Sequence, residues 1–171
     1  MRQPIDLNVF KPILGVSVVA ALTASASALL INVPVWATFI GWIAFFSRGM
    51  TARDGVINLI CVLIGLAMGI GSGLVSTELA PYTGALTITF VVLGATFVLM
   101  SVALLPVINN VLSYFLGLVC YFASNLPPAL DAWITLGIAV SVGVLGGLLA
   151  MQAHSFFSQK PKNTADSLDQ A

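Results

Sequence analysis

The sequence predicts an all-α membrane protein with six transmembrane helices, arranged as a 3+3 inverted repeat in which helices 2 and 5 are short. Three observations lead to this fold class. Hydrophobic residues make up 59% of the 171 residues and charged residues only 7%, against about 25% in soluble domains. The apolar residues form six runs separated by turns. The six basic residues fall into three clusters, which one orientation places on the same side of the bilayer.

Four of the apolar runs are long enough to cross a hydrocarbon core of about 30 Å. They cover residues 12–31, 55–75, 83–105 and 129–153. Two shorter runs, 35–46 and 111–123, each follow a turn that contains asparagine. The segments 76–82 and 124–128 are read as links, the first because it is polar and the second because it contains turn-forming residues.

Six crossings with a cytoplasmic N-terminus place every Lys and Arg in the cytoplasm. The only charged residues left in the outer loops are then Glu78 and Asp131. We therefore expect a multi-pass protein of the bacterial inner (plasma) membrane with both termini cytoplasmic. Its transmembrane domain covers 1–154, followed by a cytoplasmic polar tail over 155–171. A cleaved signal peptide ending in the small residues 23–28 is the alternative, although the apolar character continues through Ile31.

The two short runs resemble each other when residues 36–47 are laid on residues 112–123, an offset of 76. Three spans per repeat is an odd number, so repeat B (about 83–154) would enter the membrane from the side opposite to repeat A (about 12–76). Chance similarity between apolar segments is the alternative. The matched pairs include Phe39 with Phe115, Gly41 with Gly117 and Phe46 with Phe122.

A helix of about 13 residues rises only about 20 Å, less than the hydrocarbon core. Short helices at matching places in two halves indicate a central site, whereas a tilted bundle in a thinned bilayer is the alternative. We expect Gly41 and Gly117 to lie near the bilayer midplane. The residues predicted to line a pore or solute path are Thr38, Phe39, Gly41, Trp42, Asn109, Asn110, Ser113, Tyr114, Phe115 and Gly117.

Small residues four apart predict close helix packing and contacts between subunits of a homo-oligomer. The two cysteines, Cys61 and Cys120, lie in apolar runs and are expected at different depths, unbonded. The glycines assigned to helix packing are Gly65, Gly69, Gly73, Gly143 and Gly147.

The Trp-rich short run that ends at Arg48 and Gly49, together with the later segment 115–117, is similar to the YcdZ-like family of small bacterial inner-membrane proteins of unknown function. The likeness covers most of the chain, including the six apolar runs. It implies a domain of unknown function and supplies no substrate or catalytic residue.

Apart from Asp131 at the start of the last apolar run, no charged residue lies inside a run, and the single histidine, His154, follows the last one. No catalytic triad, nucleotide loop or metal-ligand spacing is present, so we expect no enzyme, no cofactor and no metal. A net charge of zero gives no footprint for nucleic acid. The expected function is a passive channel or facilitator for a small neutral or weakly charged solute. The expected partners are the lipid bilayer, further copies of the chain and that solute. A non-transporting scaffold or regulatory partner is the alternative, and a secondary carrier is third.

Overall fold

The computed structural model describes residues 10–158. The basic residues Arg2, Lys160 and Lys162, on which part of the predicted orientation rests, lie outside this range. Most of the predicted tail does too, and residues 155–158 continue the last helix.

Helices are the only regular secondary structure between residues 10 and 158, with no strand, which confirms the all-α part of the predicted fold class. The second helix has the predicted bounds, because an asparagine turn and a proline precede it. In chain order the helices are α1 (Phe10–Ala26) with its π-helical continuation η2 (Ser27–Ile31), α2 (Val35–Phe46), α3 (Ala52–Thr83), the 3-10 turn η3 (Gly84–Leu86), α4 (Thr87–Val102), α5 (Val111–Ser124) and α6 (Leu130–Ser158).

Three stretches of the described residues are long and apolar enough to cross a bilayer, namely Phe10–Ile31, Ala52–Val102 and Leu130–Ser158. The middle stretch contains α3 and α4, which η3 joins without a break. They are two separate helices because the chain reverses direction at Gly84, whose φ of 52° suits glycine. Apolar helices of this length are typical of a helical membrane protein. The remaining apolar helices, α2 and α5, have only 12 and 14 residues.

The predicted link over 76–82 is wrong, because these residues continue α3. Two of their hydroxyl groups bond carbonyls of the same helix: Ser76 Oγ donates to the carbonyl of Ser72 at 2.8 Å, and Thr77 Oγ1 donates to that of Leu74 at 2.7 Å. Polar side chains of this kind mark the end of the apolar run without ending the helix.

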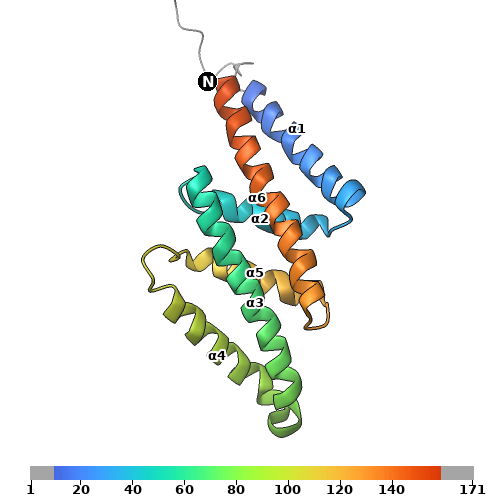
Figure 1. Cartoon of the computed structure of the whole chain (residues 1–171), viewed down its shortest axis with the longest axis vertical. Coiled ribbons are helices and arrows are strands. Elements are labelled where there is room, and N and C mark those ends of the chain that lie inside the picture. The colour runs from blue at the N-terminus through green and yellow to red at the C-terminus, as the bar shows by residue number, and fades with distance from the viewer. Residues whose placement is uncertain (1–9, 159–171) are drawn as a thin grey trace, which may run out of the picture.

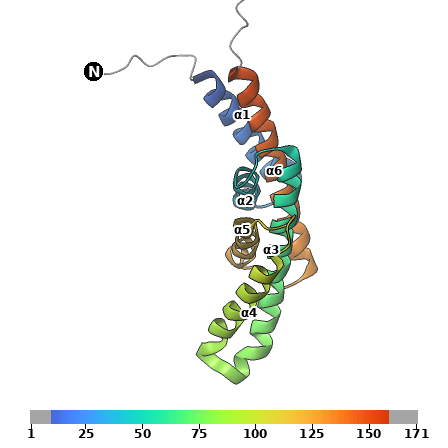
Figure 2. The same ribbon diagram turned by 90° about the vertical axis from the view of Figure 1, so that its left-hand side faces the viewer.

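The four long helices run from upper left to lower right in Figure 1, and α2 and α5 lie across the middle of the molecule. Seen from the side, α2 and α5 are viewed nearly end-on beside α3 and α6 (Figure 2). The main packing partners are α2 with α6 and α5 with α3, while α1 packs on α6 and α4 on α3. Helices α1 and α4 therefore lie at opposite ends of the molecule.

The buried side chains form two clusters. Cys120 belongs to the larger cluster, and Cys61 to a smaller one with Leu99 and Tyr114. Both cysteines are free, as predicted. The larger cluster comprises Val33, Ala37, Ala44, Val62, Leu66, Cys120, Tyr121, Leu136, Ala139 and Val140.

Candidate functional site

Each short helix crosses a long helix at a glycine. A Cβ on Gly41 of α2 would overlap the carbonyl oxygen of Val140 in α6. A Cβ on Gly117 of α5 would overlap the carbonyl oxygen of Val62 in α3. Both glycines are buried. Only glycine permits this backbone-to-backbone approach, so the two crossings depend on it.

The long helices contribute glycines to the same crossings. Gly65 of α3 lies against the backbone of Tyr114, and Gly143 of α6 lies against the backbone of Thr38. One turn further along, a Cβ on Gly69 would lie 2.8 Å from Cβ of Tyr121, and one on Gly147 would lie 2.9 Å from Cβ of Phe45. Gly73, the fifth packing glycine, also faces the ring of Tyr121.

Among the predicted path residues, Thr38 and Tyr114 are buried beside these crossings. Thr38 Oγ1 donates to Ser27 Oγ at 2.9 Å, and Tyr114 Oη donates to the carbonyl of Ile108 at 2.6 Å. Phe39 is different: 44% of its side chain is exposed, so it lies on the outer surface of α2. Trp42 and Phe115 are half-buried.

Two further predicted residues, Asn110 and Ser113, belong to a cluster of hydrogen-bonded polar side chains that we call the amide cluster. It consists of Ser47, Asn58, Asn110 and Ser113. Asn110 Nδ2 donates to Asn58 Oδ1 and to Ser47 Oγ, both at 2.7 Å. Asn110 Oδ1 accepts from the backbone N–H of Ser113 at 3.4 Å and caps α5. The hydroxyls of Ser47 and Ser113 lie 3.4 Å apart.

The amide cluster joins the end of α2, the first turns of α3 and the start of α5. Asn58 Nδ2 donates to the carbonyls of Ala44 at 3.0 Å and Arg48 at 3.1 Å. Arg48 donates in turn from its guanidinium to the amide oxygen of Asn109. Asn109, the last predicted path residue, is exposed, whereas Asn58 is fully buried. The hydrogen bonds therefore run from exposed Asn109 through Arg48 to buried Asn58 of the amide cluster.

Asn58 is the central residue of this cluster, and the sequence analysis missed it. It is a single amide within a long apolar run, and the groups it bonds belong to other segments. The signal that could have found it is its polarity at a position where a buried amide must find partners. Every buried side-chain nitrogen and oxygen among the described residues has such a partner.

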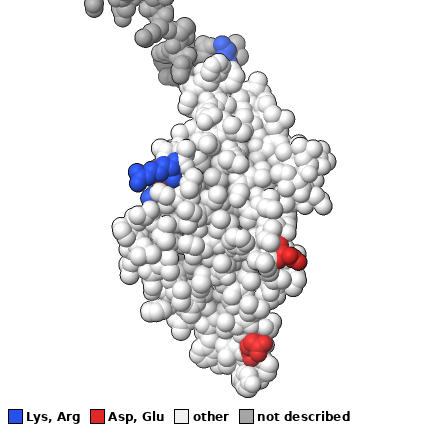
Figure 3. All heavy atoms as spheres, in the orientation of Figure 1, with Lys and Arg blue, Asp and Glu red and all other residues white. Residues whose placement is uncertain are grey.

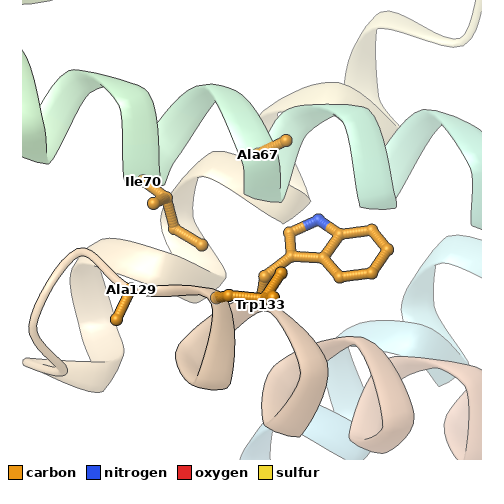
Figure 4. A pocket seen from close by; sticks show the side chains of 5 residues that line it. Ala67, Ile70, Ala129 and Trp133 are labelled. Atoms are coloured by element: carbon orange, nitrogen blue, oxygen red, sulfur yellow. The ribbon is translucent and has the colours of Figure 1, made fainter.

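Five open pockets of the described residues lie on the apolar surface, and none of these five is lined by a predicted path residue. One is an open groove of about 450 Å³ between α3 and the start of α6. Figure 4 shows Ala67 and Ile70 of α3 facing Trp133 of α6, whose indole nitrogen points towards α3. That nitrogen donates to the carbonyl of Leu63 at 3.2 Å.

Charged side chains lie at the ends of the helices. In Figure 3 basic groups lie along the upper left edge and acidic groups along the lower right edge. The helices of Figure 1 run between these edges. No group of three metal-ligating side chains occurs among residues 10–158.

These features define a helical membrane protein in which two short helices cross two long ones at glycines. The chain belongs to the family described as "Protein of unknown function (DUF1097)", whose sequence profile matches residues 13–154. Comparison with curated proteins and with solved structures gives no match.

Proposed function

We propose that the chain crosses the inner membrane six times as two inverted three-helix repeats and acts as a passive facilitator for a small neutral or weakly charged solute. In this proposal α1, α2 and α3 correspond to α4, α5 and α6. The pairings support it, because exchanging the two sets converts α2 on α6 into α5 on α3, and α1 on α6 into α4 on α3.

The observation that carries the proposal is the matching of the glycine contacts. Residues of α5 carry numbers 76 higher than their α2 counterparts, and residues of α6 carry numbers 78 higher than their α3 counterparts. These two offsets convert three glycine contacts at one crossing into three glycine contacts at the other. The matched contacts are Gly41–Val140 with Gly117–Val62, Gly143–Thr38 with Gly65–Tyr114, and Gly147–Phe45 with Gly69–Tyr121.

The proposed path follows the seam where α2 and α5 lie side by side. Ile40 and Leu116, which correspond under the offset of 76, both pack against the larger core cluster. Neither α2 nor α5 contains a charged residue, which suits a neutral solute and not an ion. The packing along the seam describes a closed conformation, and conduction requires the two short helices to separate.

The same proposal includes a cytoplasmic location of both termini, assembly into homo-oligomers in the lipid bilayer, and the absence of enzymatic activity and of nucleic-acid binding. The edges of opposite charge support the orientation. The narrower likeness to the YcdZ-like family is part of the proposal as well.

A non-transporting scaffold is the second candidate, and the dense packing of the centre favours it. The predicted path residues line none of the five surface pockets described above. No residue of α1 is buried within the chain, so the face of this helix that is turned away from α6 is available to a partner. A secondary carrier, the third candidate, would accumulate its solute against a gradient.

A stopped-flow assay on proteoliposomes separates these candidates. Purified protein is reconstituted, and light scattering follows swelling in a panel of neutral solutes such as glycerol, urea and small polyols. Faster entry of at least one solute than into empty liposomes supports the facilitator. Equal rates for every solute contradict it and favour the scaffold.

A further inference from the structure

The two ends of the α2–α5 seam differ in chemistry, although the helix crossings match. The amide cluster occupies one end. At the corresponding positions of the other half the side chains are apolar, since the offsets of 76 and 78 relate Asn58 to Leu136, Asn110 to Pro34, Ser113 to Ala37 and Ser47 to Ala123. Leu136 and Ala37 are fully buried, as are Asn58 and Ser113. A helix crossing of this kind therefore does not itself require the amides.

We propose that the amide cluster is the cytoplasmic gate of the seam, a polar latch that opens to water more readily than the apolar packing at the outer end. The proposal rests on the proposed solute path between α2 and α5. The latch holds the start of α5 to the end of α2 through Asn110 and Ser47, and to α3 through Asn58.

The chemistry of the cluster makes this end the easier one to open. Its members are neutral, so separating them leaves no buried charge, and water can replace each protein hydrogen bond at a small net cost. Exposed Asn109 and half-buried Arg48 border the cluster, so water lies next to it. Opening the other end would expose Leu136 and Ala37 to water without any compensating hydrogen bond.

Thiol accessibility tests the gate without reference to any solute. In a background carrying Cys61→Ala and Cys120→Ala, we compare Ser113→Cys with its matched control Ala37→Cys. A membrane-impermeant maleimide is applied to the cytoplasmic face of inside-out vesicles, and to both faces for the control. We expect the thiol at position 113 to react at least about tenfold faster. Equal rates would overturn the proposal, and full reaction of both thiols in detergent shows that each is chemically competent.

Cross-linking then tests whether the gate controls solute entry. Ser47→Cys with Ser113→Cys places two sulfurs where hydroxyls lie 3.4 Å apart, and copper phenanthroline oxidises them. We expect cross-linking to lower solute entry to the rate of empty liposomes, and a reductant to restore it. Neither reagent should change the rate of solute entry through the cysteine-free parent. Unchanged entry after complete cross-linking would overturn the gate. If the parent passes no solute, the proposed function fails, and the labelling rates alone decide whether the cluster opens.

Discussion

Gly41 of α2 lies against the carbonyl oxygen of Val140 of α6 with no room for a Cβ between them. Replacing this glycine by alanine must push the two helices apart, and the same holds for Gly117 against Val62. We expect Gly41→Ala and Gly117→Ala each to destabilise the protein by about 1–3 kcal/mol. Reversible unfolding in mixed SDS micelles measures this.

Gly71→Ala is the matched control, because nothing lies within 4 Å of a Cβ at this helical glycine. It should be neutral or slightly stabilising. Equal losses in Gly41→Ala and the control would contradict the close crossing. The tightness of the crossing also means that leucine at position 41 or 117 would disturb folding whether or not a path exists.

Asn58 should contribute more to the free energy of unfolding than Asn109, which borders the amide cluster. Asn58→Leu introduces the residue found at the corresponding position 136, but removes the hydrogen bond from Asn110 and the two that Asn58 donates to backbone carbonyls. We expect a loss of about 1–3 kcal/mol. Asn109→Ala removes a single contact at an exposed site and should cost less than about 0.5 kcal/mol. The same unfolding assay compares the two, and a reversed order would contradict the structure.

Most helix positions followed from the sequence, because apolar runs and turn residues are local signals. The short helix α2 has the predicted bounds for this reason. The end of α3 could not be placed, because Ser76 and Thr83 are polar yet bond carbonyls of their own helix. Loss of hydropathy marks the boundary of the apolar stretch, and the helix ends only at Gly84.

The site was harder to predict than the helices, because lipid lowers the contrast between the faces of an apolar helix. Phe39 and Thr38 are adjacent, and only the structure shows that one is exposed and the other buried. Asn58 is paired with Asn110, 52 positions away. Such long-range pairing has no local signature in a single sequence, whereas the cap formed by Asn110 has one.

The contact between η2 and α2 should be a measurable coupling. Thr38 Oγ1 donates to Ser27 Oγ at 2.9 Å, and both residues are buried. In a double-mutant cycle with Ser27→Ala and Thr38→Val, we expect a coupling energy of about 0.6 kcal/mol. Ser17, an exposed serine that bonds a carbonyl of its own helix, is the control, and Ser17→Ala should show no coupling to Thr38→Val. Coupling of equal size in both cycles would contradict the assignment.

In the proposed topology the short helices α2 and α5 each cross the membrane. Single cysteines are placed at Asn32, Met50, Ala85, Leu104 and Pro127 in a background without Cys61 and Cys120, and an impermeant maleimide is applied to intact cells and to inside-out vesicles. Ala85 represents the connection between α3 and α4, because residues 76–82 are part of α3 itself. Six crossings predict labelling from outside at positions 32, 85 and 127, and from the cytoplasm at positions 50 and 104. Labelling of positions 32 and 50 from the same side would contradict a crossing by α2 and, with it, the inverted repeat.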